Sequence, residues 1–232
     1  MSSDRTAKSS DRIVDFLPFD PDNKIQLETL TQQRILCGWA EEYIETWREQ
    51  ARRKAKGLYW VFPADTEAAR KRLRSLPDQE SFNRTSGLGP PAPHAEFRPL
   101  GHASLDWEDY DGDESLANKE KGICTIATFY ILPSQQGLGL GNVVMKGLEE
   151  KALEAGAKEI TLNTLCGIAG ATPELWESIG VEYKKDEVRL NEFWYERLGY
   201  KAYKREPRYK EKNPKTGKIV KLQAVFMKKS LQ

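Results

Sequence analysis

The chain has 232 residues, and 39% of them are hydrophobic, which is enough for one sizeable core. Its formal net charge is +1, so no overall electric field selects nucleic acids or acidic partners. No apolar run approaches the roughly 20 residues of a membrane span, and the first ten residues lack the apolar stretch of a signal peptide.

The first half of the sequence predicts alternating helices and strands. Residues 1–20 are polar, and we expect a flexible segment there, followed by a single domain over 21–232. Apolar residues recur at helical spacing from Thr31 to Lys54, which predicts one amphipathic helix. The elements that follow are, in order, a strand at 58–62, a basic helix at 67–76, a Gly/Pro loop at 86–93 and a strand at 100–107.

Acidic side chains crowd the run Asp106–Glu114, at the end of the last of these strands. The run could attract a cationic amine, or it could be a solvated acidic loop. It does not match a calcium-binding EF-hand loop, because Glu114 stands where such a loop, counted from Asp109, requires glycine.

The most informative stretch is Gln136-Gly-Leu-Gly-Leu-Gly141, which has three glycines in six residues. It follows the segment 122–132, which is apolar on both faces and predicts a central strand, and it opens an amphipathic helix over 142–155. Glycine lets the backbone turn sharply and approach a ligand closely. The first N–H groups of a helix have no partner within it, so the stretch indicates an anion site, most often one for phosphate.

Two common phosphate motifs do not fit this stretch. A P-loop requires Lys followed by Ser or Thr after its last glycine, and nothing after Gly141 supplies them. A dinucleotide fingerprint requires the spacing Gly-x-Gly-x-x-Gly, whereas these glycines fall at 137, 139 and 141. A plain strand–helix turn without a ligand stays open as the alternative.

The last third of the chain predicts a strand at 159–163, a helix from Asn191 and a β-hairpin. The hairpin strands are 200–209 and 219–227, and its basic residues favour a solvated surface over a nucleic-acid patch. Between them, Thr172–Gly180 predicts a short extra helix with Thr172 as N-cap. It belongs to an insertion at about 165–188, which could shape a substrate pocket or be a decoration.

The three cysteines indicate the compartment. Cys37, Cys124 and Cys166 are widely spaced and odd in number, which matches neither a disulfide framework nor a metal cluster. With only His94 and His102 besides, we expect no metal site. We therefore expect reduced thiols and a cytoplasmic protein, with a nuclear location left open.

Two segments together resemble the GNAT superfamily of N-acetyltransferases. The spacing Gln136-x-x-Gly139-x-Gly141, after residues 126–133, resembles the acyl-CoA pyrophosphate loop of that family. Asn191-Glu-Phe-Trp-Tyr-Glu-Arg-Leu-Gly-Tyr200 resembles its later helix, and the likeness covers roughly residues 95–228. The resemblance implies a mixed α/β fold: a bent sheet of about six or seven strands, flanked by helices on both faces and splayed at the acyl-CoA site.

The same resemblance implies acetyl-CoA as the cosubstrate. Its pyrophosphate would lie on backbone N–H groups of the glycine loop, and its pantetheine arm would lie along the preceding strand. One backbone N–H of that strand would polarise the thioester carbonyl. The implied cofactor-binding residues are Phe129, Tyr130, Ile131, Gln136, Gly137, Leu138, Gly139, Leu140, Gly141 and Asn142.

The resemblance also assigns a catalytic role to Tyr195. This residue matches the family tyrosine whose hydroxyl protonates the leaving thiolate. A core tyrosine within an aromatic helix is the alternative, and Val188, seven residues before Tyr195, stands where the family often has an Asn. The central strand carries no carboxylate, so we name Asp106 and Glu108 as candidates for the general base, with His102 as a further one.

The hypothesis is direct transfer of an acetyl group from acetyl-CoA to an amine within a ternary complex. A ping-pong route through Cys124 or Cys166 is less expected, because buried structural cysteines are commoner. The alternative is a catalytically degenerate GNAT-like module that binds acyl-CoA or a protein. We expect a small-molecule or peptide amine as the acceptor, bound in a pocket lined by the acidic run and the helix at 172–180. We expect neither a membrane nor a nucleic acid as a partner, and the oligomeric state stays open.

Overall fold

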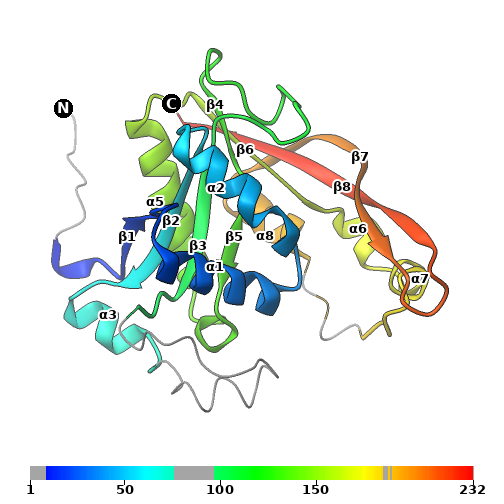
Figure 1. The fold of residues 1–232 in the computed structure, drawn as a ribbon, viewed down its shortest axis with the longest axis horizontal. Helices are drawn as coiled ribbons and strands as arrows, with labels where there is room; N and C mark the ends of the chain where they lie inside the picture. Colours follow the sequence, from blue (N-terminus) through cyan, green and yellow to red (C-terminus); the bar gives the residue numbers. More distant parts are fainter. Residues whose placement is uncertain (1–8, 76–96, 185–187, 189, 232) are drawn as a thin grey trace. The chain divides into compact units, whose positions relative to one another are not determined.

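The computed structural model describes residues 9–75, 97–184, 188 and 190–231. The chain divides into two compact units. The first unit consists of Met1–Trp107 and Ala127–Lys151, and the second unit of Glu108–Ile126 and Ala152–Gln232. Each unit combines β-strands with helices (Figure 1).

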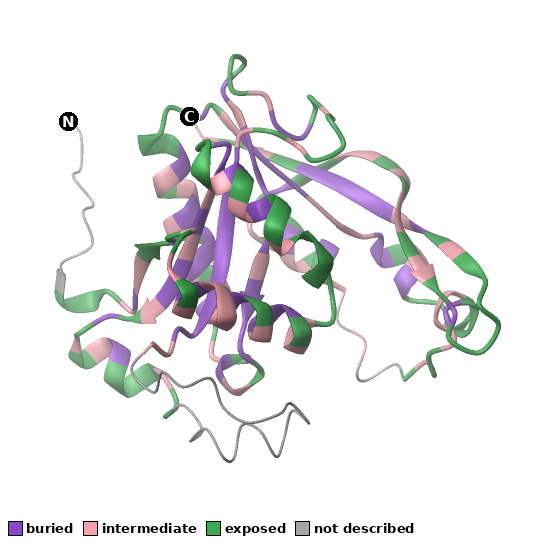
Figure 2. Cartoon of the chain, in the orientation of Figure 1, coloured by how far each residue is buried: buried purple, intermediate pink, exposed green. Residues whose placement is uncertain are grey.

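The first unit contains four strands, and β2 lies between two antiparallel partners, β1 and β3. The short strand β5 also pairs antiparallel with β3, where His102 lies opposite Tyr130. These strands are β1 (Val14–Pro18), β2 (Lys56–Pro63), β3 (Gly101–Asp106) and β5 (Phe129–Ile131). Every residue of β3 is buried, as expected of a strand at the centre of the unit (Figure 2).

Helices cover both faces of these strands, and side chains that alternate along β2 contact them on each face. Leu58 and Trp60 point to one face and form a buried cluster with Leu30 and Trp47 of the covering helices. Tyr59 points to the other face, where the ammonium of Lys151 lies 5.1 Å from its ring centroid. The helices are α1 (Lys24–Cys37), α2 (Ile44–Arg52), α3 (Glu67–Arg72) and α5 (Leu140–Glu154), with 3₁₀ turns η1 (Ser9–Asp11), η2 (Glu41–Tyr43) and η3 (Pro133–Gln135).

The single helix predicted from Thr31 to Lys54 is wrong, because the helix is interrupted between α1 and α2. Gly38 adopts φ +74° and its N–H donates to the carbonyl of Arg34 at 2.9 Å, which ends α1. Ala40 also has a positive φ, so helical geometry resumes only at the following turn. α1 begins earlier than predicted, because the side chain of Asn23 accepts from the N–H of Gln26 and caps it.

The second unit contains a parallel pair and a long hairpin. β4 pairs parallel with β6, β6 pairs antiparallel with β8, and β8 pairs antiparallel with β7, which confirms the predicted hairpin. The strands are β4 (Ile123–Ile126), β6 (Glu159–Leu165), β7 (Lys201–Lys212) and β8 (Ile219–Ser230). The helices are α6 (Gly167–Gly170), α7 (Pro173–Ser178) and α8 (Asn191–Arg197).

The central strand predicted at 122–132 is two strands. β5 pairs antiparallel with β3 and β4 pairs parallel with β6, and Ala127 and Thr128 lie between the two strands in the chain. This division raises the number of strands in the described part of the chain to eight, above the six or seven expected.

At the N-terminus, β1 lies within the range 1–20 that we expected to be flexible, so ordered structure begins before the predicted boundary at residue 21. The Gly/Pro loop at 86–93 and His94 lie outside the described residues. Within the described ranges, no helix has the length and apolar character needed to cross a bilayer.

Candidate functional site

The glycine stretch forms a tight connection from β5 to α5. Gly137 and Gly139 have φ of +81° and +69°, a conformation that residues with a Cβ rarely adopt. Gly141 lies in the first turn of α5, a helix of 15 residues. The side chain of Gln136, the first residue of the loop, donates from Nε2 to the carbonyl of Ile131 at 2.9 Å. This hydrogen bond connects the loop to β5.

The segment after α3 also contacts this loop. The Nε of Arg72 donates to the carbonyl of Leu138 at 3.0 Å, and Nη1 of Arg74 donates to the carbonyl of Ser134 at 3.2 Å. The buried side chain of Gln135 binds the main chain of Arg74 at both its N–H and its carbonyl, at 3.3 and 3.0 Å. These contacts bring two guanidinium groups to the glycine loop within the first unit.

A buried polar cluster lies where β3 meets β5. The Nδ1 of His102 lies 2.7 Å from Oε1 of Gln33, so Nδ1–H donates and Nε2 faces Nη1 of Arg34 at 3.4 Å. Burial, and then the positive charges of Arg34 and Lys56, lower the pKa of His102 well below its usual value, so the ring is neutral at pH 7. The hydroxyl of Tyr130 is buried without a hydrogen-bond partner among the described residues. Its pKa is raised to about 12, and burial is the main cause.

The two carboxylates named as candidate bases have different surroundings. Asp106 is buried, and its Oδ2 accepts from Nζ of Lys56 at 2.6 Å inside the first unit. The same ammonium donates to Oγ of Ser104 at 3.2 Å and lies 4.8 Å from the ring centroid of Trp47. Glu108 belongs to the second unit, is exposed, and forms an isolated antiparallel bridge with Asn118.

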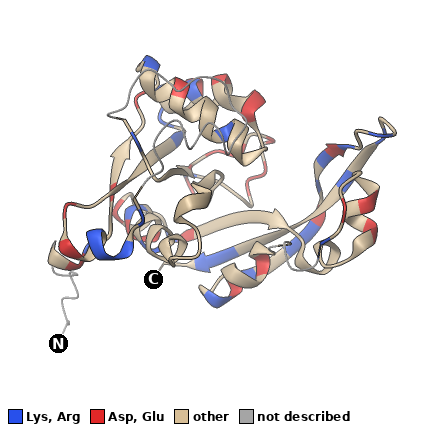
Figure 3. Ribbon diagram, turned by 90° about the horizontal axis from the view of Figure 1, so that it is seen from below, with Lys and Arg blue, Asp and Glu red and all other residues tan. Residues whose placement is uncertain are grey.

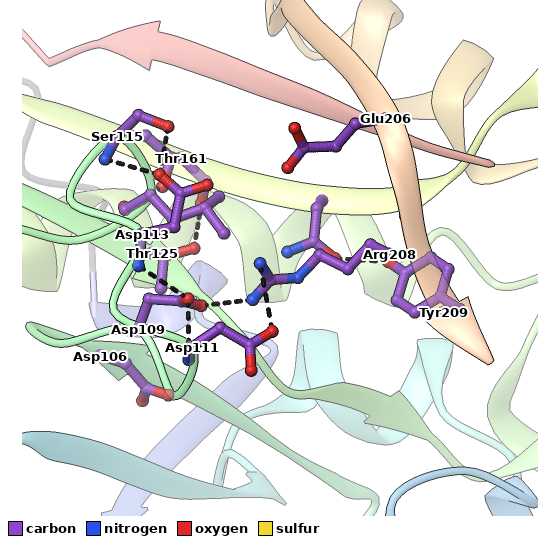
Figure 4. Close-up of polar contacts among 12 residues, drawn as sticks. Asp106, Asp109, Asp111, Asp113, Ser115, Thr125, Thr161, Glu206, Arg208 and Tyr209 are labelled. Atoms are coloured by element: carbon purple, nitrogen blue, oxygen red, sulfur yellow. Dashed lines mark hydrogen bonds and ion pairs between the residues drawn. The ribbon is translucent and has the colours of Figure 1, made fainter. Parts of the chain in front are cut away.

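Three further acids of the run pair with cations of β7. Asp109 and Asp111 lie 2.7 and 3.5 Å from guanidinium nitrogens of Arg208 (Figure 4). Asp113 lies 2.6 Å from Nζ of Lys204. Basic and acidic residues therefore occur together along the hairpin (Figure 3). These acids balance β7, which favours a structural role for this part of the run over attraction of an amine.

The extra helix α7 borders a hollow of about 630 Å³ within the second unit. Thr172 and Pro173 occupy the predicted N-cap and first helical positions, although the Thr172 hydroxyl donates to the carbonyl of Ala169 instead of capping. No residue of the acidic run lines this hollow, so it is not the shared pocket that we expected. Its lining includes Pro173, Glu177, Gly180, Tyr183, Asn213 and Lys215.

Tyr195 lies on α8, as predicted, and is 6% exposed. Its ring packs against Trp194 and Tyr200, with ring centroids 4.7 and 5.8 Å away. Burial raises the pKa of its hydroxyl, which therefore stays protonated at neutral pH. At the start of α8, the carboxylate of Glu192 accepts from the N–H of Gly167 and from Nη2 of Arg205, which anchors the helix.

Comparison with known proteins identifies the family. A family model described as the acetyltransferase (GNAT) family matches residues 33–171, more than half of the chain. The chain belongs to the GNAT acetyltransferase family. A comparison with curated protein sequences finds no match.

Solved structures of GNAT enzymes share this fold. An aminoglycoside 6′-N-acetyltransferase complexed with coenzyme A is 14% identical, with a TM-score of 0.53 over 94% of this chain and 97% of its own. The aminoglycoside 6′-N-acetyltransferase from Enterococcus faecium is 14% identical, with a TM-score of 0.51 over 94% and 97%. A spermidine/spermine N-acetyltransferase from Vibrio cholerae is 10% identical, with a TM-score of 0.53 over 94% and 93%.

The GNAT resemblance and the mixed α/β fold predicted from the two motifs are thus confirmed. The cofactor-binding residues of the loop and of β5, and the catalytic roles of Tyr195, Asp106 and Glu108, stay predictions. Sequence reasoning missed the contacts of Arg72 and Arg74 with the GNAT glycine loop. The only sign of these contacts in the sequence was the basic character of the helix predicted at 67–76. Basic character alone does not indicate which part of the chain a helix contacts.

Proposed function

We propose that this GNAT protein transfers an acetyl group from acetyl-CoA to an amine. The observation that supports the proposal most is the glycine loop, where two left-handed glycines lead into a long helix. Helix N-termini attract phosphate through their main-chain N–H groups and the helix dipole. In the proposal, residues 136–142 hold the pyrophosphate, and Phe129, Tyr130 and Ile131 of β5 align the pantetheine arm.

The reaction requires an amine that has lost its proton. The amine nitrogen attacks the thioester carbonyl, a backbone N–H of β5 stabilises the oxygen as it gains negative charge, and the C–S bond breaks. We assign protonation of the departing thiolate to Tyr195, whose raised pKa keeps its proton available at neutral pH. The proton that the nitrogen loses after its attack restores the phenol. The acetyl group passes directly from CoA to the amine, with no acyl-enzyme intermediate.

A carboxylate or a water chain takes the proton from the amine. Asp106 would have to exchange the ammonium of Lys56 for that proton, whereas Glu108 is exposed and open to water. His102 has its Nδ1–H engaged by Gln33, and its lowered pKa makes it a weak base. We therefore retain Asp106 and Glu108 as the residues to neutralise first, with Glu108 the more accessible.

The acceptor is a small-molecule or peptide amine. Aminoglycosides and polyamines are the first amines to assay, because GNAT neighbours of similar fold carry those names. Cys37, Cys124 and Cys166 form no disulfide among the described residues, which fits a reducing compartment, so the cytoplasm is the expected location.

A catalytically degenerate acyl-CoA-binding module is the second candidate function. It is favoured by one observation, the absence of a carboxylate from residues 122–132. The two functions differ in outcome: both predict CoA binding, but only the enzyme releases free CoA thiol when acetyl-CoA and an amine are mixed.

The test combines calorimetry of CoA binding with a thiol-release assay over a panel of amines and peptides. Gly139→Val tests the loop, since valine is strained at φ +69° and its Cβ would lie 2.7 Å from Nη2 of Arg72. We expect CoA affinity to fall at least about tenfold through loss of loop geometry.

Gly156→Val is the matched control. Gly156 also has a positive φ, +88°, and no atom lies within 4 Å of the place where a Cβ would be, so the variant carries the same backbone strain away from the loop. Its CoA affinity should equal that of the wild type. An unchanged CoA affinity in a folded Gly139→Val protein would contradict the proposed binding site.

A further inference from the structure

The glycine loop has no charged side chain of its own. Residues 122–145 contain no Lys, Arg, Asp or Glu, and Gln136 at the first loop position is neutral and turned toward β5. An acyl-CoA carries a pyrophosphate and a separate 3′-phosphate. Backbone N–H groups are suited to the pyrophosphate, so a protein contact with the second phosphate would come from another part of the chain.

Arg72 and Arg74 bring positive charge to this loop. Each is held by a main-chain carbonyl of the segment 134–138, and Arg74 is fixed further by the two bonds from Gln135 to its backbone. The Nη2 of Arg72 lies next to Gly139, only 2.7 Å from where a Cβ would be. A carbonyl orients a guanidinium without neutralising it, so both groups keep their full charge beside the loop.

The neighbouring cations of the same segment are neutralised. Arg70 pairs with Asp65, and Lys71 pairs with Glu67 at 2.6 Å. Among the described residues, no carboxylate forms an ion pair with Arg72 or Arg74. A guanidinium has five N–H donors, and the hydrogen bonds that each arginine side chain forms within the described part of the chain use one of them, which leaves the others for a ligand.

We propose that Arg72 and Arg74 bind the 3′-phosphate of the acyl-CoA, an inference that rests on the proposed function. The planar fork of a guanidinium donates two parallel hydrogen bonds to a phosphate, which lysine or backbone N–H groups do not reproduce. The pair therefore makes the protein select CoA over 3′-dephospho-CoA, while the loop backbone holds the pyrophosphate common to both.

Calorimetry with CoA and 3′-dephospho-CoA tests the inference on wild type, Arg72→Met, Arg74→Met and the double variant. Wild type should bind CoA at least about tenfold more tightly than 3′-dephospho-CoA. In the double variant this ratio should approach one, because CoA affinity falls while 3′-dephospho-CoA affinity changes little. Both arginines are exposed, so the variants should fold, which circular dichroism checks.

Arg70→Met is the control, since it removes one positive charge from the same helix but from an arginine paired with Asp65. It should keep both affinities and their ratio. Wild type that binds CoA without discrimination, or variants that weaken both ligands equally, would overturn the inference and leave the proposed function standing. Wild type that binds neither ligand would overturn both.

Discussion

At the scale of single residues, burial decides what the ionisable side chains can do. His102 and Tyr130 lie in one buried cluster, and burial shifts the pKa of each toward its neutral form. Burial also raises the pKa of Tyr195, which favours its neutral form. A neutral phenol is a proton donor and a neutral imidazole is not, so Tyr195 is better suited than His102 to protonate a thiolate.

Tyr195→Phe separates the catalytic role from a packing role. The substitution removes one hydroxyl and little volume, so a packing residue would show a small effect. We expect turnover to fall about 10²-fold or more with CoA affinity nearly unchanged. Steady-state kinetics and calorimetry measure the two quantities on the same preparation.

Tyr200→Phe is the control for this substitution. It removes another buried hydroxyl from the same aromatic group, 5.8 Å from Tyr195 between ring centroids. Turnover should stay at the wild-type level in Tyr200→Phe. Wild-type turnover in Tyr195→Phe would show that Tyr195 only packs the interior.

At the scale of elements, the acids at 109–113 and the cations of β7 form a network of ion pairs. Burial disfavours the charged form of Asp113, but hydrogen bonds from Lys204 and Ser115 outweigh it and lower its pKa to about 2. The ordinary value is 3.8. Because the folded-state pKa is the lower one, the ion pair stabilises the fold fully above about pH 4, and this stability is lost as pH falls toward 2.

Asp113→Asn should therefore lower the free energy of unfolding at pH 7 by about 1 kcal/mol, a value reduced for solvent screening. The difference from wild type should shrink as pH falls from 4 to 3, because Asp113 of the unfolded wild-type chain takes up a proton there while the folded chain stays ionised. Urea denaturation of both proteins at pH 7, 4 and 3 measures this difference in the free energy of unfolding.

Glu114→Gln serves as the comparison, since Glu114 pairs with Lys121 on the exposed surface. Its effect at pH 7 should be smaller than that of Asp113→Asn. A cost for Asp113→Asn that is the same at pH 7 and pH 3 would show that the ion pair with Lys204 contributes no stability.

At the scale of the whole molecule, the proposed cosubstrate should stabilise the fold. A ligand at 100 times its Kd adds about 2.7 kcal/mol to the free energy of unfolding. For a chain of this size, 1 kcal/mol shifts Tm by roughly 2–4 °C, so acetyl-CoA should raise Tm by about 5–10 °C. Differential scanning calorimetry measures the shift.

Pantetheine provides the comparison, because it has the thiol arm without any phosphate. It should raise Tm far less than CoA at equal concentration, since the loop and its arginines act on phosphates. Equal shifts from both compounds would place the binding energy on β5 instead of the glycine loop.

The sequence alone determined the features that depend on local spacing. The glycines of the loop at 137 and 139 adopt positive φ as their residue type permits, α8 contains the predicted Tyr195, and the hairpin follows the alternation of β8. Together these motifs were sufficient to predict the GNAT family and the mixed α/β fold. Such features are readable because neighbouring residues set backbone geometry directly.

The tertiary structure decided what depends on partners distant in the chain. It interrupted the strand predicted at 122–132 between Ile126 and Phe129, and it matched the acids at 109–113 with cations of β7. It also brought Arg72 to Leu138, 66 positions away. Periodicity shows which face of an element is apolar but not which element covers it, because that pairing is chosen by packing and charge across the folded chain.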